Sequence, residues 1–302
     1  MWFWLSLIAL LCWSGSDLFS KIGCRDPRDK FSPLKMVIAV GVVMGLHAAY
    51  EIFVGGTEIN LSILLTYLPV SLLYISSMTL GYVGLRYIEL SISSPICNSS
   101  GALVAVMTLI FSGISGYSPL ALVAVALVCA GAIGLGVVDA CEDEDLRAAR
   151  QETSNYKYAK SAMALAMPVA YCLLDAAGTF ADNRVLETLN EDSANVAYEL
   201  TFLLAAVVCF VYVVLIKRTP LIPKLEAPKY IGAVCETAGQ FAYIYAIADT
   251  AHLAMSAPII SSYCAASVLW SRIFLKEKLS WKHYLMILLI IIGIAIMGFF
   301  DM

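Results

Sequence analysis

Three acidic residues lie in the middle of long apolar stretches of this sequence: Asp17, Asp175 and Glu236. A carboxylate surrounded by hydrocarbon is costly unless it is paired or hydrated, so such residues usually mark a polar cavity or an ion path. They could bind a cationic or zwitterionic solute, or exchange a proton that drives its movement. A structural role stays open as the alternative, in which Asp17 pairs with Lys21 one turn further on and Asp175 hydrogen-bonds a neighbouring helix.

Aromatic rings precede two of these acids at helical spacing. Trp13 lies four residues before Asp17, and Tyr171 lies four residues before Asp175, so each ring shares a helical face with its acid. Rings beside carboxylates attract organic cations, at roughly 0.5–2 kcal/mol for each contact. The pattern favours amines and quaternary ammonium compounds over phosphorylated sugars, although any single ring could simply pack between helices.

A polar stripe runs along the apolar stretch Tyr230–Ala248. Glu236, Gln240 and Tyr243 recur at i, i+4 and i+7, which places them on one face of a helix. We expect this face to line the same cavity as the two aspartates. Glu199, in another stretch, lies about two turns inside its predicted end, so a hydrated position at the membrane interface is an equal alternative.

Prolines inside two further stretches are expected to break the helical hydrogen-bond ladder. Pro95 and Pro258 each lack a backbone N–H, and the carbonyls they leave free need a cavity or nearby hydroxyl groups. We therefore predict that both prolines lie in segments that line or gate the cavity. The other residues that we assign to the solute site and to these segments are Tyr82, Tyr245, Ser94, Asn98, Ser261, Ser262 and Tyr263.

The composition shows what must position these residues. Of the 302 residues, 61% are apolar and 14% are charged, and the mean hydropathy is +0.82. A soluble domain has roughly 25% charged residues, and a water-soluble fold of this size would lack the polar residues to cover itself. The sequence therefore predicts an integral membrane protein.

The apolar residues fall into ten stretches of about 20 residues, the length at which a helix crosses a hydrocarbon core of about 30 Å. They are Trp2–Ile22, Phe31–Phe53, Ile63–Leu85, Ile92–Phe111, Pro119–Val138, Tyr158–Phe180, Asn195–Ile216, Tyr230–Ala248, Leu253–Phe274 and Trp281–Phe300. We predict an all-α protein with ten transmembrane helices. The longest polar stretch, Asp139–Lys157, leaves no room for an aqueous catalytic domain.

The basic residues predict the orientation. All but one of the nineteen Lys and Arg residues flank the odd-numbered connections between the predicted helices, and the exception is Arg184. Because positive residues accumulate on the cytoplasmic side, we expect these connections in the cytoplasm and both termini outside, in the plasma membrane.

The two halves of the sequence repeat each other. When Pro95 is placed on Pro258, the preceding tyrosines Tyr82 and Tyr245 coincide, and the first helices match because Trp13 and Asp17 fall on Tyr171 and Asp175. We divide the chain into a first repeat at 1–139, a connection at 140–156 and a second repeat at 157–302. Five helices is an odd number, so the second copy enters the membrane from the opposite face. Such inverted repeats share a cavity near the midplane and alternate its access between the two sides.

Two segments resemble a known family. Trp13–Lys21, with the sequence WSGSDLFSK, resembles the first-helix pattern of the drug/metabolite transporter superfamily, EamA-like branch. Ser271–Trp281, with Glu277, resembles that family's connection between the ninth and tenth helices. The resemblance implies ten helices around a central cavity lined by helices 1–4 and 6–9, with helices 5 and 10 to the side. It also implies transport of amino acids, amines, sugars or other metabolites, and it leaves the solute open.

The leading hypothesis is a secondary transporter of a small amine, quaternary ammonium compound or amino acid, driven by protons or facilitative. An exporter of sugars or of neutral or anionic metabolites stays an alternative, as does a membrane-embedded enzyme or lipid-handling protein. An enzyme should show clustered acids, histidines or arginines near one interface, and no such cluster occurs in the sequence. We expect no catalytic residues, metal, cofactor or nucleic-acid partner, only a solute and the bilayer.

Small residues recur in the fifth and tenth predicted helices, at Gly131–Gly136 and Gly293–Ala295. Such faces let helices approach closely. Packing within a monomer explains them, and a homodimer through helices 5 and 10 is the alternative.

Overall fold

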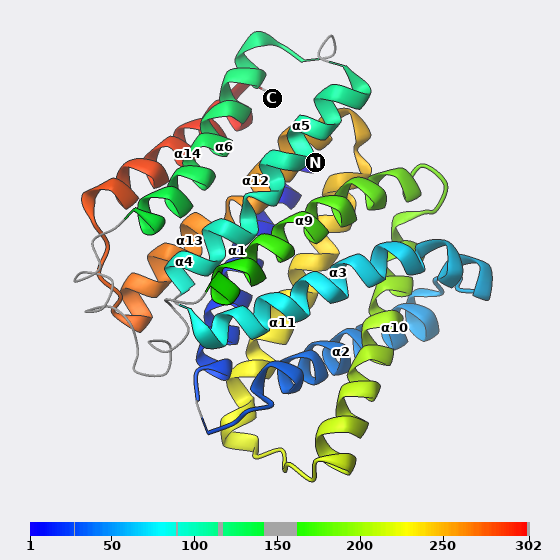
Figure 1. The fold of residues 1–302 in the computed structure, drawn as a ribbon. Helices are drawn as coiled ribbons and strands as arrows, with labels where there is room; N and C mark the ends of the chain where they lie inside the picture. Colours follow the sequence, from blue (N-terminus) through cyan, green and yellow to red (C-terminus); the bar gives the residue numbers. More distant parts are fainter. Residues whose placement is uncertain (27, 89, 114–116, 142–161, 301–302) are drawn as a thin grey trace.

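The computed structural model describes residues 1–302 except 27, 89, 114–116, 142–161 and 301–302 (Figure 1). Every regular element among the described residues is a helix, which confirms the all-α prediction. The first half contains α1 (Trp2–Cys24), α2 (Ser32–Tyr50), α3 (Leu61–Tyr87), α4 (Leu90–Asn98), α5 (Ser100–Ser112) and α6 (Pro119–Ala140). The second half contains α9 (Ala162–Val185), α10 (Glu191–Phe210), α11 (Pro223–Ala248), α12 (Leu253–Ser261), α13 (Tyr263–Trp270) and α14 (Trp281–Phe300).

These helices form the ten predicted spans, since α4 with α5 and α12 with α13 each make one crossing. By length and composition, eight helical stretches among the described residues could cross a membrane. The other two spans, α9 and α11, have 24 and 26 residues and are long enough, but they carry the acids Asp175, Asp182 and Glu236. These two spans are thus less apolar than the other eight because they carry buried acids.

Helix contacts have the pattern expected for two inverted five-helix repeats. The first helix of each half packs on the third helix of the other half, α1 on α11 and α9 on α3. The second and fifth spans pack on their own counterparts, α2 on α10 and α6 on α14, and the fourth span packs on the ninth through α5 with α12 and α4 with α13. Exchanging the halves leaves these contacts unchanged, whereas among the described residues the contact of α4 with α6 has no equivalent of similar size between α12 and α14. The division of the chain at 140–156 remains a prediction, because residues 142–161 lie outside the described part.

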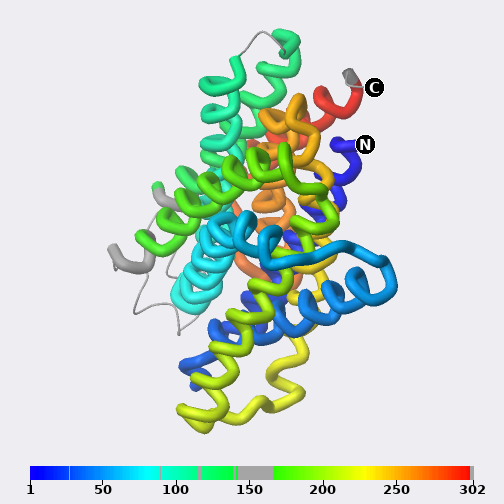
Figure 2. The backbone as a smooth tube through the Cα atoms, turned by 90° about the vertical axis from the view of Figure 1, so that its right-hand side faces the viewer, coloured from blue at the N-terminus to red at the C-terminus, as the bar shows by residue number. Residues whose placement is uncertain are grey.

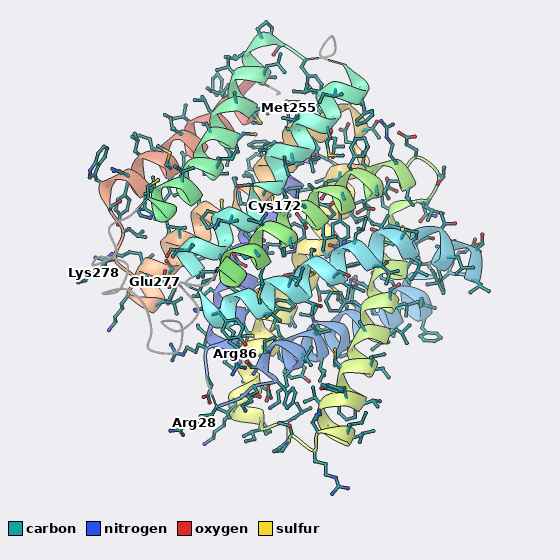
Figure 3. All side chains as sticks on the ribbon, in the orientation of Figure 1. Arg28, Arg86, Cys172, Met255, Glu277 and Lys278 are labelled. Carbon is teal, nitrogen blue, oxygen red and sulfur yellow. The ribbon has the colours of Figure 1, made fainter. Side chains whose placement is uncertain are left out.

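The two ends of the chain lie on the same side of the molecule (Figure 2). A Cβ atom built on Gly298 would lie 2.2 Å from Cζ of Phe3, so the end of α14 touches the start of α1. Figure 3 shows Lys278 at the left edge of the molecule and Arg86 and Arg28 below it, toward the lower left. All three belong to odd-numbered connections or their borders, so these positive charges gather at one end.

The two spans that contain Pro95 and Pro258 are each interrupted four residues after that proline. The N–H of Ser99 donates to the carbonyl of Pro95 at 3.1 Å, and the N–H of Ser262 donates to the carbonyl of Pro258 at 2.9 Å. Beyond these serines the chain begins a new helix, α5 or α13. The predicted interruption therefore lies one turn beyond each proline, at the serine whose N–H reaches back to the proline carbonyl.

Gly131 and Gly134 of the fifth span and Gly293 of the tenth lie in the contact between α6 and α14. A Cβ atom on Gly131 would lie 2.5 Å from Cγ1 of Ile290, and one on Gly293 would lie 2.6 Å from Cγ2 of Val128. These small residues therefore permit close packing within one chain.

Candidate functional site

A cavity lies between the two halves, and α1, α3, α4, α9, α11 and α12 supply most of its lining. The space outlined by its walls, including the part open to solvent, is about 900 Å³. The span α10 contributes Tyr198, whereas no described residue of α2 lines the cavity. The family resemblance implied a lining from helix 2 as well. In this chain α2 packs behind the lining, against α10 and α11.

Asp17 is held by two other helices. Its Oδ2 accepts hydrogen bonds from Ser94 on α4 at 2.5 Å and from Ser267 on α13 at 2.8 Å. Lys21, one turn further on, donates to the carbonyls of Leu85 and Ile88 at the end of α3, each at 2.9 Å. The carboxylate of Asp17 therefore lies in the cavity wall between two broken helices.

Asp175 occupies the equivalent position of the second half and also lines the cavity. Its Oδ2 accepts a hydrogen bond from the hydroxyl of Ser100 at 2.7 Å. Ser100 is the first residue of α5, directly after the helix interruption. The unbonded N–H groups at a helix start favour negative charge nearby, so α5 stabilises this carboxylate in two ways. Asp175 thus hydrogen-bonds a neighbouring helix, as its structural alternative required, whereas the hydrogen bonds of Asp17 described above come from serines of two other helices and not from Lys21. Both aspartates still line the cavity.

Glu236 brings a third carboxyl group into the same lining. It is 8% exposed, and Ser16 on α1 lines the cavity close to its side chain. Asp17 and Asp175 are both close enough to interact electrostatically with it. Trp13 fixes this part of α11 by donating from Nε1 to the Glu236 carbonyl at 3.3 Å. Three acids therefore share one cavity.

Aromatic rings cover much of the remaining wall. The ring centroid of Trp13 lies 5.0 Å from that of Tyr243 and 5.9 Å from that of Tyr263. Tyr82 and Tyr171 also line the cavity. Among the described residues, the lining contains neither Lys nor Arg. The wall thus combines negative charge with ring faces.

Some polar groups of the wall have no partner within the described part of the chain. They are the hydroxyls of Ser20 and Tyr82 and the Nε2 group of Gln240, all buried. A buried donor or acceptor without a partner costs free energy comparable to a lost hydrogen bond. In a polar cavity such groups are available to water or to a solute.

Most of the residues predicted for the site meet in this cavity. The predicted residues that line it are Trp13, Asp17, Tyr82, Ser94, Asn98, Tyr171, Asp175, Glu236, Gln240, Tyr243, Ser261 and Tyr263. Pro95, Pro258 and Ser262 belong to the interrupted helices without lining it. Tyr245 lies elsewhere, where its hydroxyl hydrogen-bonds Asp192 and its ring packs on Phe241.

The sequence analysis missed one buried acid, Asp182, and its neighbour Thr179. The predicted sixth span ended at Phe180, whereas α9 continues to Val185. Asp182 is 0% exposed and accepts a hydrogen bond from Tyr67 at 2.8 Å. A signal was present, because Asp175, Thr179 and Asp182 recur at i, i+4 and i+7 like the stripe found on α11.

Glu199 does not line the cavity, and its side chain is buried. It is 0% exposed, and its Oε1 lies 2.8 Å from Nδ1 of His47 on α2. The amide of Asn195 donates to the same carboxyl group at 3.2 Å. The alternative of a hydrated Glu199 is therefore wrong, because the side chain is buried and a histidine from the neighbouring span pairs with it.

Comparison with known proteins agrees with this geometry. Residues 164–299 match the model of the EamA-like transporter family. This half of the chain belongs to that family. A solved crystal structure is 14% identical to the chain, covers 98% of it and 96% of its own length, and superimposes with a TM-score of 0.61. At this identity the likeness concerns the fold alone. No curated relative matches the sequence.

The resemblance to the EamA-like branch of the drug/metabolite transporter superfamily is therefore confirmed over residues 164–299, and the apolar helices fit a multi-pass membrane protein. The EamA-like match runs from α9 to α14 and contains Asp175 and Glu236. The first half completes the cavity with Asp17. Neither half forms the site alone.

Proposed function

We propose that this protein moves a small organic cation across the plasma membrane by alternating access, with Asp17, Asp175 and Glu236 as the solute-binding acids. One observation carries the proposal: three carboxyl groups and several aromatic rings line one cavity, and no described Lys or Arg lines it. Coulombic attraction in a partly dehydrated site is stronger than in water, and each ring adds roughly 0.5–2 kcal/mol of cation–π attraction.

The charge of the lining favours an amine or a quaternary ammonium compound over an amino acid. The ammonium group of an amino acid would find three acids, but its carboxylate would find no described basic side chain in the wall. A buried carboxylate without a partner is costly. The proposed solute therefore carries a positive charge and no negative one.

Alternating access is supported by a difference between repeat-equivalent residues. Near the midplane both members of a pair line the cavity, as with Asp17 and Asp175. Toward the odd-numbered connections Tyr82 lines it, whereas its counterpart Tyr245 at the other end does not. This difference is expected when the cavity between two inverted repeats is open at one end and closed at the other, because equivalent residues then lie at opposite ends. With the odd-numbered connections in the cytoplasm, the cavity extends inward.

Uptake of labelled choline and ethanolamine into proteoliposomes tests this function. We expect uptake by the wild type and a loss of about tenfold or more in Asp17→Asn and in Asp175→Asn, since each removes a charge from the cavity wall. Asp192→Asn, at an exposed position outside the cavity, is the matched control. Uptake of a neutral or anionic solute that is unaffected by both cavity substitutions would refute the cation assignment.

A further inference from the structure

Asp182 lies one turn beyond the end of the cavity, on the polar face of α9. Asp175 and Thr179 line the cavity, and Asp182 follows them on the same face at 0% exposure. It lies near the end of α9 that leads to an even-numbered connection, opposite to the end toward which Tyr82 and Ser20 extend the cavity. The acid is thus placed at the closed end.

Four hydroxyl groups from three helices surround this acid and close the space between it and the cavity. Tyr67 donates to Oδ1 at 2.8 Å, and Tyr74 approaches Oδ2 at 3.3 Å. The hydroxyls of Tyr74 and Tyr243 hydrogen-bond each other, and each lies 3.2 Å from Oγ1 of Thr179. We call Tyr67, Tyr74, Thr179, Asp182 and Tyr243 the tyrosine–aspartate cluster.

Few other titratable groups face this cluster among the described residues. Tyr198 on α10 and Asp175 on α9 interact with it electrostatically. Arg184, two residues after Asp182, is 45% exposed and pairs with Glu187 at 2.8 Å. Asn183 donates to the carbonyl of Ile247 on α11. Within the described part of the chain, the hydrogen-bond partners of Asp182 are therefore hydroxyl groups rather than basic side chains.

The tyrosine–aspartate cluster has fewer hydroxyl protons than hydrogen-bonding contacts. The cluster contains five hydroxyl or carboxyl contacts at hydrogen-bonding distance. Its three tyrosines and one threonine supply one proton each, and an ionised carboxylate supplies none. Four of the five contacts can then be hydrogen bonds. A proton on Oδ2 completes the set, because Asp182 then donates to Tyr74, Tyr74 to Tyr243, Tyr243 to Thr179, and Thr179 back to Tyr74.

We propose that Asp182 is a proton-binding site, separate from the solute-binding acids, whose proton completes the tyrosine–aspartate cluster and holds this end of the cavity closed. When the proton leaves, one contact is lost and a buried charge remains, and both changes favour opening to water. The gating role rests on the proposed transport function, whereas the binding of a proton by Asp182 does not depend on it.

Infrared titration of the reconstituted protein tests the proton site directly, because protonated and ionised carboxyl groups absorb at different frequencies. We expect a protonated-carboxyl band that decreases as the pH rises and is missing in Asp182→Asn. Identical spectra for the wild type and Asp182→Asn, or an Asp182 band that does not change with pH, would overturn the proposal. If Asp182→Asn fails to fold, as judged by gel filtration, Thr179→Val is titrated instead, and its band should disappear at lower pH than in the wild type.

Exchange of labelled choline at equal pH on both sides tests the gate. The wild-type rate should fall about fivefold or more between about pH 8 and pH 5, as the carboxyl group binds its proton. Thr179→Val leaves three contacts and three hydroxyl protons, so the cluster no longer needs the extra proton and the dependence should flatten. Tyr67→Phe is the matched control, since it also removes one hydroxyl but leaves four contacts for three protons, and the dependence should persist.

The outcomes separate the two proposals. A wild-type pH dependence that survives unchanged in both Asp182→Asn and Thr179→Val would overturn the gate while leaving cation transport intact. If the wild type exchanges no choline at any pH, the proposed transport of cations fails, and the infrared titration still decides whether Asp182 binds the proton.

Discussion

Asp17 and Asp175 accept hydrogen bonds from opposite sides of one helix interruption. Ser94, five residues before Ser99, donates to Asp17, and Ser100, the residue after it, donates to Asp175. A cation that binds either acid therefore competes with a hydroxyl at the same hinge between α4 and α5. This arrangement couples the two repeats through their shared solute site.

The shared site predicts that the two aspartates do not act independently. Asp17→Asn and Asp175→Asn should each weaken binding of choline in detergent by about tenfold. Because both acids bind one solute in one cavity, the double variant should lose clearly less than the product of the two effects. Isothermal titration calorimetry measures all four proteins of the cycle. Strict multiplication of the two losses would argue for two separate sites.

The unpartnered hydroxyl of Tyr82 predicts a loss of affinity without a loss of stability. Tyr82→Phe removes no hydrogen bond from the empty protein, so its Tm should equal or exceed that of the wild type. Binding of ethanolamine should weaken by about tenfold or more, the effect of one hydrogen bond to a charged group. Tyr245→Phe is the repeat-equivalent control and should leave affinity unchanged. An equal loss in both variants would contradict the observed asymmetry of the cavity.

Alanine is predicted to have different effects on Tm at Gly131, which lies in the contact between α6 and α14, and at Gly136, which faces α4. Gly131→Ala places a methyl group 2.8 Å from the backbone carbonyl oxygen of Met286, so the helices must separate and Tm should fall. Gly136→Ala finds its nearest neighbour at 3.5 Å and improves helix propensity by up to about 1 kcal/mol, so Tm should stay or rise. Choline affinity of the folded protein should be unchanged in both. Equal Tm values for the two variants would refute this packing.

A buried ion-pair network predicts a large effect on stability at Glu226. This residue is 5% exposed and lies 3.3 Å from Nζ of Lys35 and 2.8 Å from Nζ of Lys229. Glu226→Gln leaves both ammonium groups buried with less negative charge, at a cost of about 3 kcal/mol. Thermal unfolding in detergent should show a clear fall in Tm. Glu187→Gln, in an exposed pair worth about 0–1 kcal/mol, should leave Tm nearly unchanged, and a similar fall in both would refute the network.

Sequence reasoning located the spans and most of the cavity because these features depend on local properties. Apolar length sets the number of crossings, and helical spacing places Glu236, Gln240 and Tyr243 on one face. Asp182 was missed because the loss of hydropathy at Phe180 looked like the end of the span. The helix continues because distant tyrosines on α3 satisfy the carboxyl group, and such partners cannot be read from local sequence.

The internal repeat predicted more symmetry than the cavity has. Equivalence of Tyr82 and Tyr245 suggested that both would line the site, yet Tyr245 packs on Phe241 at the opposite end. Repeat-equivalent residues of inverted copies lie at opposite ends of the cavity. A structure open at one end therefore includes only one of them, and the sequence carries no information about which end is open.

A comparison of two solutes that differ in one group tests the central claim most directly. Choline and glycine betaine share a quaternary ammonium group, but betaine carries a carboxylate where choline carries a hydroxymethyl group. Because three acids and no described Lys or Arg line the cavity, proteoliposomes should take up choline at least about tenfold faster than betaine. This preference should disappear in the Asp17→Asn, Asp175→Asn double variant. Equal uptake of both solutes by the wild type, or faster uptake of betaine, would contradict the account.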